Sequence, residues 1–84
     1  MERDELFAGV RRVLLAKWDP CGVGDNPNLT DEYDGYADDV VDALLASPSI
    51  ASLTAVLEDA ESELGVVLPQ EQRVRTAKRL LSLL

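Results

Sequence analysis

Apolar residues recur every three or four positions in four stretches of the chain, and no stretch alternates apolar and polar residues for long. This period is typical of amphipathic helices, so the pattern predicts an all-α fold. The predicted helices run from Asp4 to Lys17, from Thr30 or Asp31 to Ala46, from Pro48 to Leu64 and from Pro69 to Leu84. Their predicted inward faces consist of Leu6, Phe7, Val10, Val13, Leu14 and Leu15, then Tyr33, Tyr36, Ala37, Val40, Val41, Leu44 and Leu45, then Ile50, Leu53, Val56, Leu57, Ala60 and Leu64, and finally Val74, Ala77, Leu80, Leu81 and Leu84.

Proline, glycine and small polar residues separate these stretches. Pro20 ends the first helix, since proline forces the residue before it out of the helical region. The loop of residues 19–29 is long for a connection between helices, and Thr30 is a plausible N-cap after it. Ser47-Pro48 is typical of an N-cap followed by a first-turn proline, and Gly65 of a helix C-terminus. We therefore predict a compact bundle of about four helices with one long ordered loop between helices 1 and 2; a looser hairpin of the last two helices is the alternative.

Length and composition place this fold in one domain. A chain of 84 residues, 46% of them hydrophobic, fits a single helical domain over residues 1–84. No apolar run approaches the roughly 18 residues that span a bilayer, and the first residues lack the pattern of a secretory signal, so we expect a cytoplasmic protein without membrane contact. The single Cys21 cannot form an internal disulfide, which agrees with a reducing compartment.

The amino-acid inventory argues against catalysis. The chain has no histidine, the commonest general base and metal ligand. Histidine-dependent nucleophilic sites and zinc sites built from histidine and several cysteines are therefore not available to this chain alone. A small helical domain also offers little concave surface for a substrate. We predict no catalytic, cofactor-binding or metal-binding residues, and a protein that is not an enzyme.

The charged residues are unevenly distributed. Net charge is −8, yet all eight basic residues lie before Trp18 or after Gln72, and thirteen acidic residues lie between those two positions. Either the ends of the chain neutralise its middle by ion pairs within the fold, or the acidic middle meets a basic partner. Neutralisation within the fold is the commoner arrangement, but Asp34, Asp38 and Asp42, spaced four residues apart, repel one another on a helix, and a small domain that keeps such a stripe can use it to meet a basic partner. Nucleic-acid binding is excluded, because it depends on cations meeting phosphate.

The densest motif is Trp-Asp-Pro-x-Gly-Val at residues 18–23, followed by Asp-Glu-Tyr-Asp-x-Tyr at residues 31–36. The indole of Trp18 is the largest apolar group in the chain, so we predict that it is buried and anchors the loop. Asp19 is expected to accept hydrogen bonds from nearby backbone N–H groups, and the hydroxyls of Tyr33 and Tyr36, if buried, need a partner that is either Asp19 or a loop carbonyl. The candidate site residues are Trp18, Asp19, Pro20, Gly22, Asp31, Glu32, Tyr33, Asp34 and Tyr36, together with Asp38 and Asp42.

This paired motif resembles the signature of a family of small uncharacterised bacterial proteins. Leu64-Gly65-Val66 matches a helix end often found in them, and Ala77, Leu80 and Leu81 match their closing apolar helix. The resemblance implies an all-helical bacterial domain of the cytoplasm. It implies no particular activity, so the motif is either a functional site or a packed turn that needs these residues.

Two main hypotheses for function follow, and a carboxylate-based enzyme or metal-binding protein is a third option. The first is a non-enzymatic, acidic protein-binding module, inhibitor-like or immunity-like, that binds a basic protein surface. The alternative is a structural, self-associating protein, because its last helix has more leucine than one face can bury. That homodimer would form through Leu80, Leu81, Leu83 and Leu84.

Overall fold

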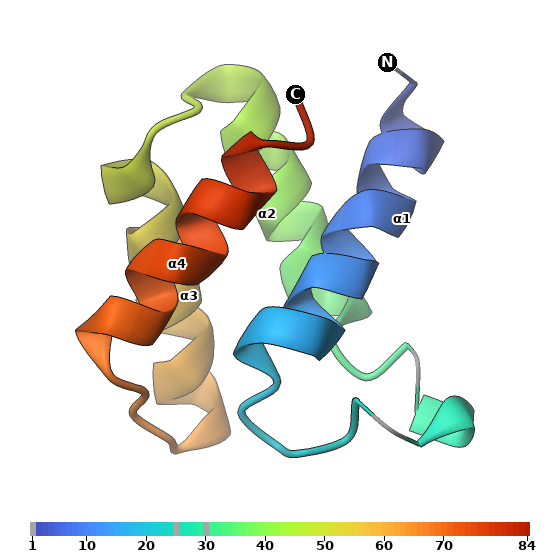
Figure 1. The fold of residues 1–84 in the computed structure, drawn as a ribbon, viewed down its shortest axis with the longest axis vertical. Helices are drawn as coiled ribbons and strands as arrows, with labels where there is room; N and C mark the ends of the chain where they lie inside the picture. The colour runs from blue at the N-terminus through green and yellow to red at the C-terminus, as the bar shows by residue number, and fades with distance from the viewer. Residues whose placement is uncertain (1, 25, 30) are drawn as a thin grey trace.

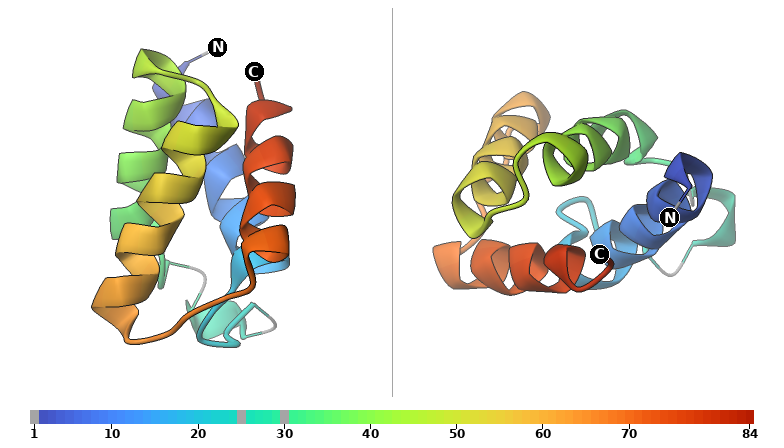
Figure 2. Two further views of the ribbon diagram at one scale, coloured as in Figure 1. Left: turned by 90° about the vertical axis from the view of Figure 1, so that its left-hand side faces the viewer. Right: turned by 90° about the horizontal axis from the view of Figure 1, so that it is seen from above.

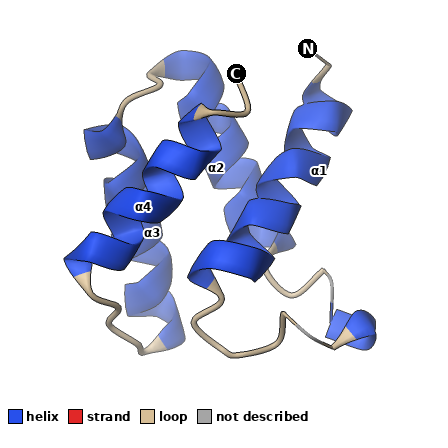
Figure 3. Cartoon of the chain, in the orientation of Figure 1, coloured by secondary structure: helices blue, strands red, loops and turns tan. Residues whose placement is uncertain are grey.

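A computed structural model, which describes residues 2–24, 26–29 and 31–84, has four α-helices and, within those residues, no strand. They are α1 (Arg3–Val13), α2 (Asp34–Ala46), α3 (Ile50–Leu64) and α4 (Gln70–Leu81). A π-helical turn, η1 (Leu14–Trp18), continues α1, and a short 3-10 turn, η2 (Pro27–Leu29), lies in the following loop (Figures 1 and 3). The predicted all-α bundle with a long loop between its first two helices is confirmed.

Each helix packs beside the next one in the chain, and α4 returns to η1 and α1. Seen down the shortest axis, α1 and α4 form the near side of the bundle, and α2 and α3 form the far side (Figures 1 and 2). The radius of gyration of the Cα atoms is 11.6 Å, close to the roughly 12 Å expected for a compact chain of this length. The alternative of a loose C-terminal hairpin is therefore wrong.

The core draws on all four helices. Its fully buried side chains come from the predicted stripes, because every stripe turns toward the bundle axis. Three predicted core residues are instead exposed: Leu45 at 57%, Ile50 at 36% and Leu84 at 60%. Each lies at or beyond a helix end, where the neighbouring turn no longer covers it. The core consists of Leu6, Val10, Val13, Leu14, Trp18, Tyr33, Ala37, Val40, Val41, Leu44, Leu53, Leu57, Ala60, Ala77 and Leu80.

Two predicted helix starts are wrong. The second helix begins at Asp34, because Asp31, Glu32 and Tyr33 form turns before it; Thr30 lies outside the described residues. The third helix begins at Ile50, and its N-cap is Ser49. The Ser49 hydroxyl accepts a hydrogen bond from the Ser52 N–H at 3.1 Å, and the Ser52 hydroxyl accepts one from the Ser49 N–H. These two reciprocal bonds form a capping box.

The end of the first helix positions the loop that follows. The predicted helix to Lys17 is α-helical only to Val13, and η1 then adds one wide turn. The Asp19 N–H donates to the carbonyl of Leu14, five residues back, at 2.8 Å, as a π turn requires. Asp19 itself has a left-handed backbone with φ of 31°, so the chain reverses there, directly after Trp18 enters the core.

No helix in the described residues is both long enough and apolar enough to cross a lipid bilayer.

Candidate functional site

The carboxylate of Asp19 organises the loop after η1. It accepts hydrogen bonds from the backbone N–H groups of Val23 and Gly24, each at 2.8 Å, and from the Tyr33 hydroxyl at 2.8 Å. The Tyr33 oxygen in turn accepts from the Cys21 N–H at 2.9 Å. The hydrogen bond predicted between Asp19 and a tyrosine is confirmed, and it ties the first half of the motif to the second.

These contacts change the acidity of both groups. Partial burial works to raise the pKa of Asp19, but hydrogen bonds from Tyr33 and the Gly24 and Val23 N–H groups outweigh it, so its pKa lies below the usual value. Burial, aided by the bond to Asp19, raises the pKa of Tyr33 above its ordinary range, against the opposing Cys21 N–H. The loop is therefore held by a carboxylate that stays ionised and a phenol that stays neutral.

Gly24 allows this carboxylate to sit close to the backbone. A Cβ atom at this position would lie 2.5 Å from the carbonyl oxygen of Leu15 and 2.8 Å from an Asp19 oxygen. Any other residue would push the loop away from η1. Gly22 has φ of 67°, so the two glycines make the turn possible for different reasons.

Trp18 is 1% exposed, which confirms its predicted burial. Its ring meets the rings of Tyr33 and Tyr36 edge-on, at centroid distances of 5.2 and 6.1 Å. Its indole N–H donates to the carboxylate of Glu61 at 3.1 Å. The first half of the motif is thus joined to α3 as well as to the start of α2.

Glu61 is the centre of a buried polar network that the sequence analysis missed. Its two oxygens accept two bonds from the Arg73 guanidinium, each at 2.9 Å, and one from the Leu68 N–H at 2.8 Å, besides that from Trp18. Burial acts to raise the pKa of Glu61, but the bonds from Arg73, Leu68 and Trp18 lower it overall. Glu61 is only 2% exposed and Arg73 8%, so this network belongs to the core.

Helical spacing could have revealed this pair. Glu61 follows Leu57 by four residues on the apolar side of α3, and Arg73 precedes Ala77 by four on the apolar side of α4. Two opposite charges on facing apolar stripes predict a buried ion pair. Glu61 instead resembled one more member of an acidic run.

The predicted aspartate stripe is paired inside the fold. Asp34 receives two hydrogen bonds from the Arg11 guanidinium, one of them at 2.9 Å. Arg3 lies 3.7 Å from Asp38 and 3.0 Å from Asp42. All three contacts join α2 to α1, so intramolecular neutralisation is the interpretation that the geometry favours for this stripe.

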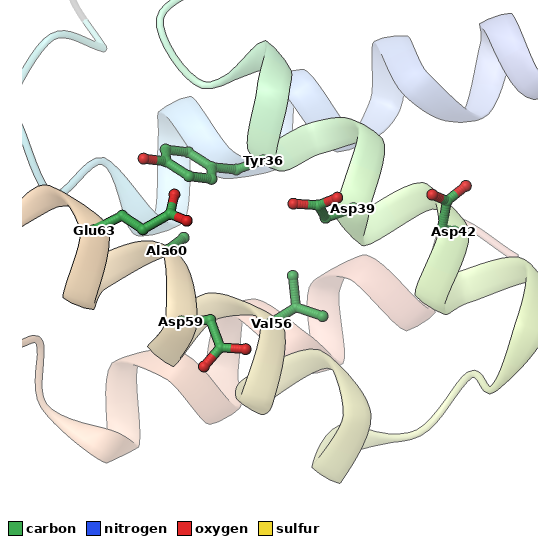
Figure 4. Close-up of a pocket in the computed structure, with 7 residues that line it drawn as sticks. All are labelled: Tyr36, Asp39, Asp42, Val56, Asp59, Ala60 and Glu63. Atoms are coloured by element: carbon green, nitrogen blue, oxygen red, sulfur yellow. The ribbon is translucent and has the colours of Figure 1, made fainter.

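A second acidic surface lies on the other side of α2. Tyr36, Asp39 and Asp42 of α2 face Val56, Asp59, Ala60 and Glu63 of α3 across a hollow of about 280 Å³, which we call the acidic groove (Figure 4). Val56 and Ala60 provide its apolar part, and carboxylates stand on both sides. No basic side chain of the described part of the chain lines it.

Of the predicted candidate residues, only Tyr36 and Asp42 reach this groove. Burial and the nearby carboxylate of Glu63 raise the pKa of Tyr36, so its hydroxyl remains protonated beside that acid. The sequence analysis missed Asp39, Asp59 and Glu63 as groove residues. Spacings of three and four residues along α2 and α3 carry the signal, since they place these acids on one side of each helix.

The remaining motif residues shape the turn or lie at its surface. Pro20 is half-buried, while Asp31 and Glu32 are exposed before α2. Among the described residues, no group of three or more acidic or cysteine side chains is placed to hold a metal ion. The motif therefore consists mainly of residues that fix the loop, and only Tyr36 joins it to the groove.

The predicted leucine interface has little free surface. Leu80 is fully buried in the core, and Leu81 and Leu83 are half-buried. A Cβ atom on Gly9 would lie 3.1 Å from the Leu83 side chain, which shows how closely that leucine covers α1. Only Leu84 is well exposed, so Leu80 is not available to a second copy.

Comparisons with protein-family models, with curated proteins and with solved structures find no match to this chain.

Proposed function

We propose that the protein is a non-enzymatic binding module whose acidic groove receives a lysine-rich or arginine-rich segment of a partner protein. The observation that carries the proposal is the lining of the groove: four carboxylates around two small apolar residues, with no basic side chain among its described lining residues, although one of the four, Asp42, also contacts Arg3. Those carboxylates belong to Asp39, Asp42, Asp59 and Glu63.

The groove suits the two chemical parts of a basic side chain. Lysine and arginine have apolar stems that pack on apolar surface while the charged end stays in contact with water or acids. Val56 and Ala60 offer such a surface, and the surrounding carboxylates lie within reach of the charged end (Figure 4). The ring of Tyr36 adds a face on which a cation can rest.

The charge of the whole molecule supports the same partner. With a net charge of −8, the protein attracts a basic surface from a distance and speeds its association. A partner whose own basic cleft is covered in this way would be inhibited. This is the inhibitor-like or immunity-like role that the proposal includes.

The test is binding of a fluorescently labelled, lysine-rich helical peptide, followed by anisotropy at about 0.05–0.15 M salt. The groove variant carries Asp39→Asn, Asp59→Asn and Glu63→Gln. The control variant carries Asp4→Asn, Glu5→Gln and Glu71→Gln, three exposed acids outside the groove, and has the same net charge.

The groove variant should bind about tenfold more weakly, because each exposed ion pair contributes about 0.5 kcal/mol. The control should differ from the wild type by less than about twofold, through the long-range field alone. Equal weakening in both variants would show that net charge, and not the groove, attracts the peptide.

A further inference from the structure

A basic surface lies between α1 and α4. Two adjoining hollows of about 380 and 270 Å³ share Ala16, Lys17 and Arg79, and together they form what we call the basic groove. Arg12 and Arg75 add two more cations, and no carboxylate of residues 2–24, 26–29 or 31–84 lines either hollow. Its apolar and uncharged lining comes from Gly9, Val13, Ala16, Gln72 and Leu83.

These cations are not used inside the fold. Arg3, Arg11 and Arg73 form the ion pairs of the described chain, whereas Arg12, Lys17, Arg75 and Arg79 have no ion-pair partner among the described residues. All four are exposed. A protein with twice as many acids as bases therefore keeps four bases together on one side.

The two grooves face in opposite directions. The basic groove lies between the two helices nearest the viewer in Figure 1, and the acidic groove lies between the two helices behind them. The Cα trace extends 19 Å along this viewing direction, more than twice the Debye length of about 8 Å at physiological salt. Charges on one face therefore act almost independently of those on the other.

We infer that the basic groove of one copy docks on the acidic groove of a second copy, so that the protein associates head to tail. The inference rests on the proposed function, because it names a partner for the same acidic groove. The four cations would meet three carboxylates without an ion-pair partner among the described residues, together with Asp42, which also contacts Arg3, and the apolar floors would lie against one another. Each groove supplies the class of side chain that the other lacks.

Opposite faces determine the form of the assembly. A contact between two different patches leaves one groove of each kind free at the ends, so it extends into open chains of copies. The net charge of −8 per copy opposes this, but charges farther away than a Debye length are screened while those in the contact are not. Association should therefore be weak, appear near 0.15 M salt and disappear near 1 M.

The experiment is sedimentation equilibrium at about 0.15 M salt and up to about 1 mM protein. Variant A is the groove variant with Asp39→Asn, Asp59→Asn and Glu63→Gln, which keeps only its basic groove. Variant B carries Arg75→Gln and Arg79→Gln, which keeps only its acidic groove. The average mass of the wild type should rise past that of a dimer, and A and B alone should stay monomeric.

A mixture of A and B in equal amounts is the decisive sample. It should form a dimer and stop there, since each pair has one intact acidic groove facing one intact basic groove. Variant A carries three fewer negative charges than the wild type, so its loss of association cannot be caused by stronger repulsion between copies. A mixture that stays monomeric, or a variant that associates alone, would overturn the inference.

The two proposals fail in different ways. If the wild type stays monomeric at 1 mM while the lysine-rich peptide binds its groove, the head-to-tail contact is wrong and the proposed function stands. If neither the peptide nor a second copy binds, both are wrong. A closed dimer that persists at 1 M salt would point to Leu84 and the other exposed apolar residues, and would also overturn the inference.

Discussion

Arginine–carboxylate ion pairs join two pairs of neighbouring helices, and the two contacts differ in how far they are exposed to water. We call the contact between α3 and α4 the covered seam and the contact between α1 and α2 the exposed seam. Between α3 and α4, Arg73 and Glu61 are almost wholly covered and satisfied by further hydrogen bonds. Between α1 and α2, Arg3 lies against Asp38 and Asp42 with all three side chains about half exposed or more. Water and salt screen the Coulomb attraction at the exposed seam but not at the covered seam. Breaking an ion pair should therefore lower the free energy of unfolding strongly at the covered seam and weakly at the exposed seam.

Removing the Trp18 indole, which donates to Glu61 beside the covered seam, should have the largest effect on stability. Trp18→Ala should lower the free energy of unfolding by about 3–5 kcal/mol, because it leaves a cavity and removes a donor from Glu61. Urea titration measures this loss, and Lys17→Ala, at the exposed neighbouring position, should stay within about 0.5 kcal/mol of the wild type. An unchanged urea midpoint for Trp18→Ala would mean that the buried indole does not stabilise the fold.

Breaking the covered ion pair should have almost as large an effect. Arg73→Met leaves the carboxylate of Glu61 buried without its cation, which should destabilise the protein by about 3–5 kcal/mol. Adding Glu61→Leu should restore part of the loss, since the uncompensated charge is then gone. Arg3→Met, at the exposed seam, is the matched single change and should be far milder. Equal denaturant midpoints for Arg73→Met and Arg3→Met would show that the two kinds of ion pair contribute alike.

Lowering the pH should destabilise the protein through its partly or wholly buried carboxylates, Glu61 and Asp19. Glu61 and Asp19 have folded-state pKa values below their ordinary values of 4.5 and 3.8, so their stabilising contribution is present above those values and lost as the pH falls further. Stability measured from pH 7 to pH 3 should therefore be nearly constant at first and fall below about pH 4.5. Glu61→Gln should flatten this fall, because it removes the carboxylate whose pKa is lowered in the folded protein. A fall of the same steepness in Glu61→Gln would exclude Glu61 as its cause.

The smallest effect should come from the exposed seam. Replacing Asp38 and Asp42 with asparagine removes their contacts to Arg3 and also their mutual repulsion, so the two changes offset each other. The free energy of unfolding should stay within about 0.5 kcal/mol of the wild type at low and high salt. A loss of more than about 1 kcal/mol that disappears in high salt would mean that this seam holds the bundle together.

Periodicity predicted the fold because helices bury stripes, and stripes are visible in a sequence. Leu53 and Leu57 lie in the core for this reason. The helix ends were predicted less well, since Ser49 and Ser47 are equally good caps on paper and only the geometry of the capping box distinguishes them. The pairing of charges depends on which helices become neighbours, so no local pattern assigned Asp38 to Arg3.

The candidate site divides in the same way. The bond between Asp19 and Tyr33 joins residue types a short distance apart, and Asp19 was one of the two partners predicted for the tyrosine hydroxyls. The acidic groove joins residues from two helices whose relative rotation is set by the core, so Asp59 and Glu63 could be placed beside Asp39 only after the fold was known. A search for acidic residues at helical spacing on two successive helices would have reduced the number of candidates for the acidic groove.

The π turn at Leu14–Trp18, which connects α1 to the loop, contains one residue more than an α-helical turn would need. A turn closed by a bond to the fifth residue back contains one residue more than an α-helical turn over the same stretch of axis. Ala16 and Lys17, within that turn, are both exposed. Loss of one of them would let the turn close as an ordinary helix and still deliver the indole to the core, whereas the same loss earlier in α1 would rotate every later side chain by about 100°. Within α1 and η1, changes in chain length are therefore best tolerated at this turn, directly beside the buried Trp18.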